Sequence, residues 1–391
     1  MSNFTIVPVH SPVQEKQFLD VVEGIYRDNA AYVRPLDKDL RGIFDRKKNK
    51  FFRHGDAARW LAVDESGRAV GRIAAFVNDK YTKQFPGVGG MGFFECINDP
   101  GLAHQLMDEA KTWLLAKGMT AMDGPINFGE RDRFWGLVID QFQHAPYYGQ
   151  NFNPDYYPQL FTSYGFEVYY NQFIYYRKVH DPLQEKFEQR AQMLMKDSRY
   201  TVEMINKKNK DKLAVEFKEV YNKAWGKREG EGFAGMSEAQ ARGIVNALYP
   251  IMDNKLGYFA YFEGEPIGFY IAIPEINAIF KSFRGKFGLW QKLQFLYRLK
   301  TGFCRTSVGL VFGVAPDHQG KGVEGLLFKK CSEELIRANV YDDVIITWIG
   351  DFNIKMINVI ESLGGRMHQS MATLRYLFDR NAPFERHPYK V

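Results

Sequence analysis

VGLVFGVAPDHQGKGVEGLLFKKCSEEL, residues Val308 to Leu335, is the stretch that decides the fold. A β-prone run ends at Val314, and Pro316 closes the strand because it has no amide proton to donate. Gly320 and Gly322 lack a Cβ atom, so their backbone amides can approach an anion closely. The helix that follows directs unpaired N–H groups and the positive end of its dipole at the same place. The stretch therefore predicts a phosphate-binding turn between a strand and a helix.

The segment PDHQGKGVEGLL resembles the acyl-CoA pyrophosphate loop of the GNAT N-acyltransferase superfamily. That loop has Gln or Arg, two residues, Gly, one residue, and Gly or Ala; Gln319 and Gly322 fit, and Lys321 adds a positive charge. The last position departs from the pattern because it holds Glu324, which suits the helix dipole but repels a diphosphate unless it turns away or pairs with a cation. The resemblance implies these cofactor-binding residues: Phe312, Gly313, Val314, Gln319, Gly320, Lys321, Gly322, Val323, Glu324, Gly325 and Asn353.

A second family feature follows in ITWIGDFNIKMINVIESLGG, where a strand leads to a helix that begins at Asn353. In the GNAT superfamily this helix lies beside the pantetheine arm of CoA. Many members carry a tyrosine here that protonates the leaving CoA thiolate, whereas this chain has Ile360, which cannot donate a proton. Transfer would then need another acid or a water, and the sequence identifies no catalytic residue.

The order of elements indicates an internal duplication. LAVDESGRAVG, which ends at Gly71, matches FAYFEGEPIG, which ends at Gly268, as two strands joined by an acidic-glycine turn. NPDYYPQLFTSYGF from Asn153 likewise matches NIKMINVIESLGG from Asn353. Because both offsets are near 200 residues, one duplication explains both matches. We predict an α/β (α+β) chain with two tandem GNAT-like domains, each a mixed, mostly antiparallel twisted sheet flanked by helices.

A charged, helix-prone connector over residues 181–198 separates the two copies. Asp181 is a candidate helix cap, and Pro182 suits the first helical position. We therefore place an N-terminal domain at 1–180 and a C-terminal domain at 199–391.

In the first copy, FFECINDPGLAHQ stands where the loop stands in the second. It has one glycine, and the acidic Glu95 and Asp99 replace a phosphate cradle. We interpret this copy as a degenerate domain that has lost the cofactor and buttresses its neighbour or supplies walls to a shared site. Its loop GPINFGERDRFWG offers Glu130, Arg131 and Arg133 either as substrate contacts at the rim of the sheet or as ordinary surface charge.

Residues 276–304 form an insertion where a compact domain of this type needs only a short turn. From 276 to 316 the chain has no acidic residue and seven basic ones interleaved with aromatic and aliphatic side chains. The basic residues are Lys281, Arg284, Lys286, Lys292, Arg298, Lys300 and Arg305. Three interpretations stay open: a lid over a hydrophobic or acyl substrate, a helix that makes peripheral membrane contact through 280–300, and a domain-packing helix with solvated basic ends.

The composition limits the other classes of function. A net charge of +6 over 391 residues is too diffuse to indicate a nucleic-acid partner. Cys96, Cys304 and Cys331 lack CxxC spacing, and the eight histidines lack metal-ligand spacing, so we expect no metal site. The chain shows no signal region and no apolar run long enough to span a membrane, which favours a cytoplasmic location.

The leading hypothesis is an N-acyltransferase that uses acetyl-CoA or a longer acyl-CoA, bound in the second domain, to acylate a small-molecule amine. The family implies that a backbone amide near Phe312 to Val314 polarises the thioester carbonyl. Glu275 is a guess for the general base. The competing hypothesis is a catalytically inactive tandem domain that binds a ligand, a lipid or a protein, which Glu324 and Ile360 favour. The acyl acceptor, the acyl length and the oligomeric state are not predicted.

Overall fold

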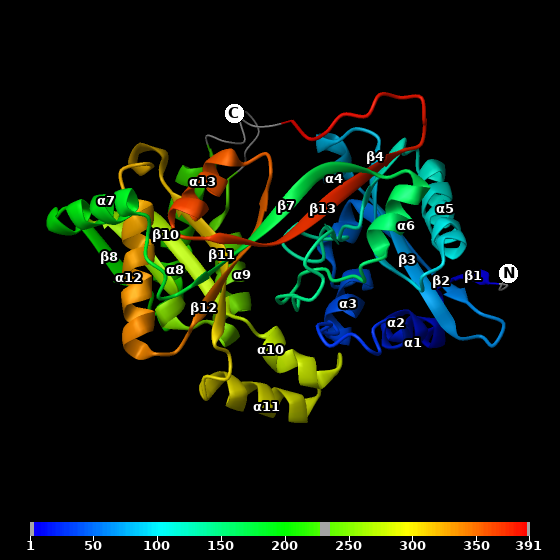
Figure 1. Cartoon of the computed structure of the whole chain (residues 1–391), viewed down its shortest axis with the longest axis horizontal. Coiled ribbons are helices and arrows are strands. Elements are labelled where there is room, and N and C mark those ends of the chain that lie inside the picture. Colours follow the sequence, from blue (N-terminus) through cyan, green and yellow to red (C-terminus); the bar gives the residue numbers. More distant parts are fainter. Residues whose placement is uncertain (1–3, 227–234, 389–391) are drawn as a thin grey trace.

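The computed structural model of the chain describes residues 4–226 and 235–388. One long twisted sheet runs through these residues, and helices cover both of its faces (Figure 1). Its strands lie in the order β1-β2-β3-β4-β5-β13-β7-β12-β11-β10-β9-β8, and β6 pairs with β13. The pairing is antiparallel except between β4 and β5 and between β11 and β12, which are parallel.

The strands of the described residues are β1 (Thr5–Pro8), β2 (Gly55–Val63), β3 (Ala69–Asn78), β4 (Val88–Cys96), β5 (Ala121–Gly124), β6 (Leu137–Val138), β7 (Glu167–Lys178), β8 (Tyr200–Met204), β9 (Gly257–Phe262), β10 (Glu265–Pro274), β11 (Thr306–Val314), β12 (Asp343–Gly350) and β13 (Arg366–Leu377). The helices are α1 (Pro12–Asp20), α2 (Val22–Ile25), α3 (Asp37–Phe44), α4 (Asp79–Gln84), α5 (Pro100–Ala116), α6 (Tyr157–Tyr164), α7 (Glu185–Lys196), α8 (Lys210–Gly226), α9 (Glu238–Leu248), α10 (Asn277–Phe280), α11 (Leu289–Lys300), α12 (Val323–Ala338) and α13 (Ile354–Ser362).

The two halves of the chain exchange strands at the centre of the sheet. β13, the last strand of the chain, lies between β5 and β7 of the first half, and β7 lies against β12 of the second half. Figure 1 shows β7 in green and β13 in red side by side across the middle of the molecule. The predicted mixed, mostly antiparallel sheet with two repeated halves is confirmed, and the halves share one continuous sheet.

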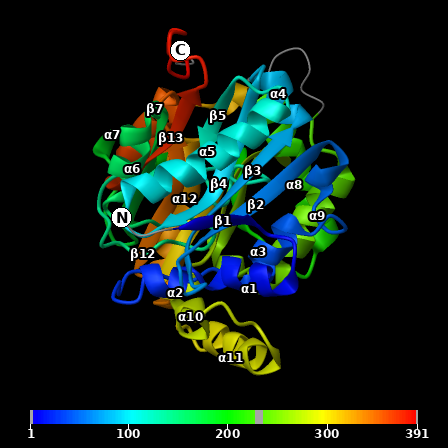
Figure 2. The same ribbon diagram turned by 90° about the vertical axis from the view of Figure 1, so that its right-hand side faces the viewer.

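The repeat is visible element by element. The β2–β3 hairpin corresponds to β9–β10, the β4–α5–β5 unit to β11–α12–β12, and α6 to α13. Figure 2 shows α5 lying along the sheet of the first half, over β3 and β4. Leu102, Leu106, Ala110 and Leu114 recur at the spacing that predicts one buried helix face, and all four side chains of α5 are buried.

Two boundaries differ from the sequence-based expectation. The connector helix α7 begins at Glu185 rather than after Asp181, because the Asp181 carboxylate accepts the Lys178 N–H at 2.9 Å and pairs with Arg366 instead of capping a helix. The sequence also predicts one helix from about Val13 to Arg27, and the structure divides this segment into α1 and α2.

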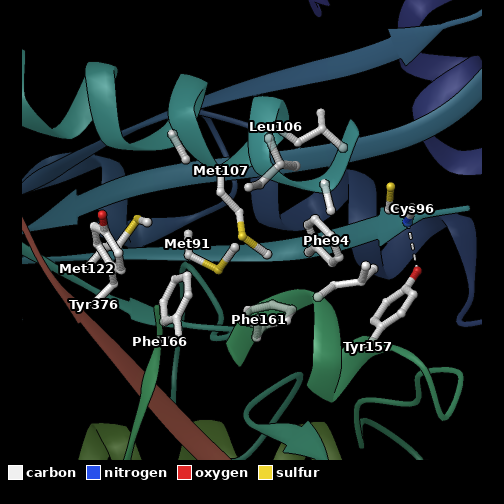
Figure 3. Packing of buried hydrophobic residues seen from close by; sticks show 14 of the residues in the cluster. Met91, Phe94, Cys96, Leu106, Met107, Met122, Tyr157, Phe161, Phe166 and Tyr376 are labelled. Atoms are coloured by element: carbon white, nitrogen blue, oxygen red, sulfur yellow. Dashed lines mark hydrogen bonds between the residues drawn. The ribbon is translucent and has the colours of Figure 1, made fainter. Parts of the chain in front are cut away.

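Each half has its own hydrophobic core. In the first half, Met91 and Phe94 of β4 face Met107 of α5 and Phe161 of α6 (Figure 3). Burial of each such side chain contributes about 2 kcal/mol, before the entropy of ordering it is subtracted. The second core forms between the β9–β12 strands and α12, with Leu327 and Leu335 of that helix at most 1% exposed.

Candidate functional site

The candidate site lies where β11 and β12 separate. The two strands pair in parallel from Thr306 with Asp343 to Gly309 with Ile346, and no further pairing joins their described residues. The register of β10 against β11 shifts at the same level, and so does that of β12 against β7. The Thr347 hydroxyl donates a hydrogen bond to the Gly309 carbonyl at 2.9 Å. Beyond this fork the strands diverge and leave room between their carboxyl-terminal ends.

The loop after β11 closes the wide end of the fork. Gln319 donates a hydrogen bond from Nε2 to the Val314 carbonyl at 2.8 Å, which ties the loop back to the strand it leaves. Gly320 and Gly322 have φ angles of +70° and +110°, in the left-handed region that favours glycine. Gly322 is the N-cap of α12, so the loop amides and the start of that helix face the same space.

A cavity of about 210 Å³ occupies the fork. It joins the loop to the first turns of α13 and to the end of α8. Its lining residues are Phe187, Arg190, Ala224, Trp225, Phe312, Gly313, Val314, Gln319, Gly320, Gly322, Glu324, Lys355, Met356 and Val359. One end is therefore built from loop amides and charged side chains, and the rest from apolar walls.

Glu324 stands at the polar end of this cavity. Its Oε1 atom accepts the Gly320 N–H at 3.2 Å, so the carboxylate holds one of the amides that an anion at this helix start would use. The side chain is buried, and Oε2 has no hydrogen-bond partner among the described residues. The predicted conflict between this carboxylate and a diphosphate is thus located at a specific amide.

Basic side chains also belong to the cavity and to its loop. Arg190 of α7 donates from Nη1 to the Gly320 carbonyl at 3.1 Å, Lys355 of α13 lines the cavity, and Lys321 is exposed in the loop. With Glu324 as the one carboxylate in the lining, the local balance favours an anion.

Other residues that were predicted to bind the cofactor have structural roles. A Cβ at Gly313 would meet the Trp225 ring at 2.5 Å, so glycine lets this indole pack on the strand. A Cβ at Gly325 would meet the Phe187 carbonyl oxygen at 3.1 Å, where α7 crosses α12. Val323 is fully buried. Phe312 and Val314 line the cavity, and Asn353 caps α13 by accepting the Met356 N–H at 3.3 Å.

Three further residues lie away from the cavity lining. Ile360 is buried in the second core. The Glu275 carboxylate accepts N–H groups of Tyr148, Asn277 and Ala278, and burial raises its pKa to about 7. It lies at the end of β10 opposite the loop, which does not fit the role guessed for it as general base. His318 contacts Tyr200 and Phe262, and burial lowers its pKa.

The charged loop of the first half is also remote from this cavity. Glu130 pairs with Lys50 at 2.9 Å, Arg131 donates to Gln84 at 3.1 Å, and Arg133 lies over the Tyr148 ring. These contacts are typical of surface ion pairs, surface hydrogen bonds and ring packing.

The equivalent fork of the first half is filled by protein. β4 and β5 pair in parallel from Val88 to Gly90 and then diverge, as β11 and β12 do. There the chain after β5 folds into the opening, and the Ile126 N–H donates to the Met91 carbonyl at 2.8 Å. A Cβ at Gly92 would meet the Ile126 oxygen at 1.8 Å, so the glycine is needed for this close approach. The remaining cavity measures about 50 Å³.

Buried polar side chains complete the filling. Tyr26 and Tyr157 donate hydrogen bonds to Glu95 Oε2 at 2.8 and 2.9 Å, and Arg72 pairs with Oε1 at 3.4 Å. Burial raises the pKa of Glu95 despite these partners. Asp99 caps α5 by accepting the Leu102 N–H at 3.0 Å, where a phosphate would sit at the start of the matching helix. These contacts give a physical reason for the degenerate character expected of this half.

Sequence reasoning missed five important residues of the site: Phe187, Arg190, Trp225, Lys355 and Met356. They come from three helices outside the glycine loop. Nothing in the local sequence distinguishes Arg190, in the connector helix, from a basic residue that is solvated on the surface. Lys355 and Met356 follow a recognised feature, since they lie two and three positions after Asn353.

Among the described residues, no group of three or more His, Cys, Asp or Glu side chains could hold a metal ion. The same residues contain no helix that meets the length and hydropathy needed to cross a membrane.

Comparison with known proteins supports the assignment of the fold. No model of a known protein family matches the chain. The bacterial ceramide synthase of Caulobacter vibrioides is 24% identical over 377 residues, covering 94% of this chain and 96% of that protein.

Two solved structures share the arrangement. A tandem GNAT protein from the clavulanic acid biosynthesis pathway superposes with a TM-score of 0.55 at 13% identity, covering 98% of this chain and 100% of that one. A GCN5-related glucosamine N-acetyltransferase region of a fungal β-N-acetylglucosaminidase gives a TM-score of 0.56 at 12% identity over 96% of this chain, which spans 38% of that protein.

Proposed function

We propose that this chain, which has a tandem GNAT fold, is an acyl-CoA-dependent N-acyltransferase with its donor site in the second half. The observation that carries the proposal is the cavity at the β11–β12 fork. Apolar walls lead there to loop amides at the start of α12, as a thioester arm and its diphosphate require. The two-domain division at 1–180 and 199–391, joined by residues 181–198, is part of the same proposal.

Each part of the cavity has a role in this proposal. The amides of the Gly320–Gly322 segment would bind the diphosphate, and Arg190, Lys321 and Lys355 would offset its charge. Trp225, Phe312 and Met356 would line the pantetheine arm. Gln319 keeps the loop in place through its bond to Val314.

In the reaction, an amine attacks the thioester carbonyl, a C–N bond forms, the C–S bond breaks and the thiolate leaves. A backbone amide near Phe312 to Val314 would polarise the carbonyl as negative charge develops on its oxygen. Glu324 lies at the phosphate end and Ile360 lies in the core, so neither side chain would exchange a proton with the reacting atoms. The proton lost by the amine would therefore pass to water, and water would return a proton to the thiolate.

The substrates are proposed from chemistry and from the curated relative. A ceramide is an N-acylated long-chain amino alcohol, so the name of the Caulobacter protein favours a fatty acyl-CoA over acetyl-CoA as the donor and a lipid amine as the acceptor. We also place the protein in the cytoplasm, because Cys96, Cys304 and Cys331 are all free thiols.

A second candidate is a catalytically inactive protein that binds a ligand through the same fold. The observation that favours it is the Glu324 carboxylate on the Gly320 amide, which competes with a phosphate for that donor.

Calorimetry with acetyl-CoA and palmitoyl-CoA, followed by a thiol-release assay with a long-chain amine, tests both candidates. The acyltransferase predicts binding and release of free CoA, whereas the inactive protein predicts binding without release. If neither thioester binds, the acyltransferase proposal is wrong.

Substitutions at Gly320 change the charge of the loop with less effect on packing than substitutions at Gly322. A Cβ at Gly322 would meet Arg190 at 2.8 Å, so Gly322→Asp would disturb packing as well as charge. At Gly320 a Cβ would meet none of the described atoms within 4 Å. We expect Gly320→Asp to bind CoA more weakly than Gly320→Asn, because the two side chains have the same shape and differ in charge. Equal affinities would place the diphosphate elsewhere.

A further inference from the structure

The insertion between β10 and β11 is the feature that the donor site does not use. Its helices α10 and α11 project from one edge of the molecule, next to α1, α2 and α3 of the first half (Figures 1 and 2). The two views agree that α11 is the outermost element on this edge.

The inner side of the insertion is firmly packed. Phe280, Phe283, Phe295 and Cys304 form a buried cluster with Leu36 of the first half. Hydrogen bonds fix the insertion to the first half. The Asp37 N–H donates to the Gly285 carbonyl at 2.8 Å, and Lys281 donates to the Ala30 carbonyl at 2.7 Å. Glu275 binds the first turn of α10 and the Tyr148 N–H, as described above. The position of α11 is therefore fixed by contacts on its inner side.

The outer side of α11 is apolar and exposed. Leu289, Trp290 and Tyr297 are 77%, 74% and 70% exposed, and Leu293 and Leu296 are 52% and 47% exposed. These positions follow i, i+1, i+4, i+7 and i+8, so they share one face of the helix. A domain-packing helix would show solvated polar residues there. The packing interpretation accounts for the inner side and leaves this face unexplained.

Basic side chains are spread over the insertion, and three of them, Lys292, Arg298 and Lys300, lie on α11 itself. Among the described residues, none of the following forms an ion pair with a carboxylate: Lys281, Arg284, Lys286, Lys292, Arg298 and Lys300. The nearest carboxylates of α3 are engaged elsewhere, since Asp37 pairs with Arg34 at 2.8 Å and Asp39 accepts the Tyr148 hydroxyl at 2.7 Å. The edge thus presents uncompensated positive charge around an apolar row.

We infer that the outer face of α11 docks on the surface of an anionic lipid bilayer. The helix has 12 residues, about 18 Å, which is too short to cross a bilayer and sufficient to lie in its interface. Its Trp and Tyr rings and leucines enter the headgroup boundary, and Lys292 and Lys300 contact anionic headgroups. The charge complementarity favours lipid over a protein partner, and the inference does not depend on the acyltransferase proposal.

Vesicle flotation of the full chain is the first measurement. Phosphatidylcholine vesicles with and without phosphatidylglycerol are compared at low and high salt. We expect binding to the anionic vesicles that weakens as salt rises, because screening shortens the reach of the basic residues. Absence of binding to anionic vesicles at low salt would overturn the inference.

Two double variants test the face itself. Lys292→Gln with Lys300→Gln is expected to weaken binding about 25-fold, from about fivefold for each lysine. Trp290→Ser with Leu293→Ser is expected to weaken it more than about tenfold, since both side chains leave the lipid. All four side chains are exposed, so folding is preserved.

Matched controls remove similar groups elsewhere. Met193→Ser with Met367→Ser removes two side chains that are 69% and 50% exposed, and Lys186→Gln with Lys208→Gln removes two exposed charges. Controls that lose as much binding as the face variants would contradict the inference. So would a dimer seen in gel filtration that the face variants dissociate, which would assign the face to a second copy. The affinity of the same variants for CoA, measured by calorimetry, is expected to equal that of wild type. A loss of vesicle binding can therefore be distinguished from a defect in the donor site.

Discussion

The substitution Glu324→Gln is expected to tighten CoA binding. Gln has the same shape as Glu, and its oxygen can still accept the Gly320 N–H, so the loop keeps its hydrogen bond while the negative charge is removed. The variant therefore measures the charge of Glu324 and little else.

The magnitude follows from the geometry at Gly320. Glu324 Oε1 lies 3.2 Å from the Gly320 nitrogen. A phosphate oxygen that accepts the same N–H would lie about 2.9 Å from that nitrogen, which puts the two anions at most about 6 Å apart. Their repulsion is then about 0.7 kcal/mol in a water-like dielectric and about 2.8 kcal/mol at an effective dielectric constant of about 20. Because Glu324 is buried and the loop is exposed, we expect a gain between these limits, about tenfold in Kd.

Isothermal titration of wild type and Glu324→Gln with CoA provides the measurement. Glu333→Gln is the control, since Glu333 lies on the same helix, more than two turns away and more exposed. The reasoning is refuted if wild type binds CoA and Glu324→Gln binds with equal affinity, because the carboxylate would then not face the diphosphate. Weaker binding would mean that Glu324 assists the ligand through a bound cation.

Three further predictions concern the site, the insertion and the sheet. Arg190→Gln and Lys355→Gln should each weaken CoA binding about fivefold, because each removes a cation from the lining of the cavity. Titration at low and high salt should show a smaller salt dependence in both variants. Glu275→Gln should reduce the pH dependence of stability, because burial raises the pKa of Glu275 from 4.5 to about 7. Its stabilising contribution is present below about pH 4.5 and is lost as pH rises through about 7, so urea unfolding at about pH 5 and about pH 8 should show wild type losing about 2.5 kcal/mol more than the variant. The separate segments 1–184 and 185–391 should each fail to fold cooperatively, because each lacks a central strand that the other supplies. Co-expression of the two segments should restore soluble protein. Cooperative thermal unfolding of either segment alone would contradict this.

Features with a local chemical signal could be predicted from the sequence. The hairpin ending at Gly268, the strand that ends before Pro316 and the helix after Gly322 all follow from turn chemistry and periodicity, and the structure contains each of them. The glycine turn after β11 could be predicted because Gly320 and Gly322 adopt positive φ angles that favour residues without a side chain. Glu324 was recognised as a departure from the family pattern.

Features that depend on distant contacts could not be predicted in this way. Nothing in the sequence around Arg190 indicates that α7 lies against α12 and brings this guanidinium to Gly320. The filling of the first fork depends on Gly92 meeting the backbone of Ile126, which is a tertiary contact between segments that each look ordinary. The exchange of β7 and β13 was also hidden, because a strand between two others has the same pattern whichever half supplies its neighbours.

The strand exchange makes the second fork depend on the first half of the chain. β7 belongs to the first half, yet it lies against β12 and forms part of the support for the second fork. Arg177 of β7 donates to the Leu363 carbonyl just after α13, the helix that brings Lys355 and Met356 to the cavity. The first half fills its own fork with Glu95, Arg72 and tyrosines, and at the same time β7 supports the fork of the second half. A substitution that displaces β7 would therefore reach the second fork through the shared sheet.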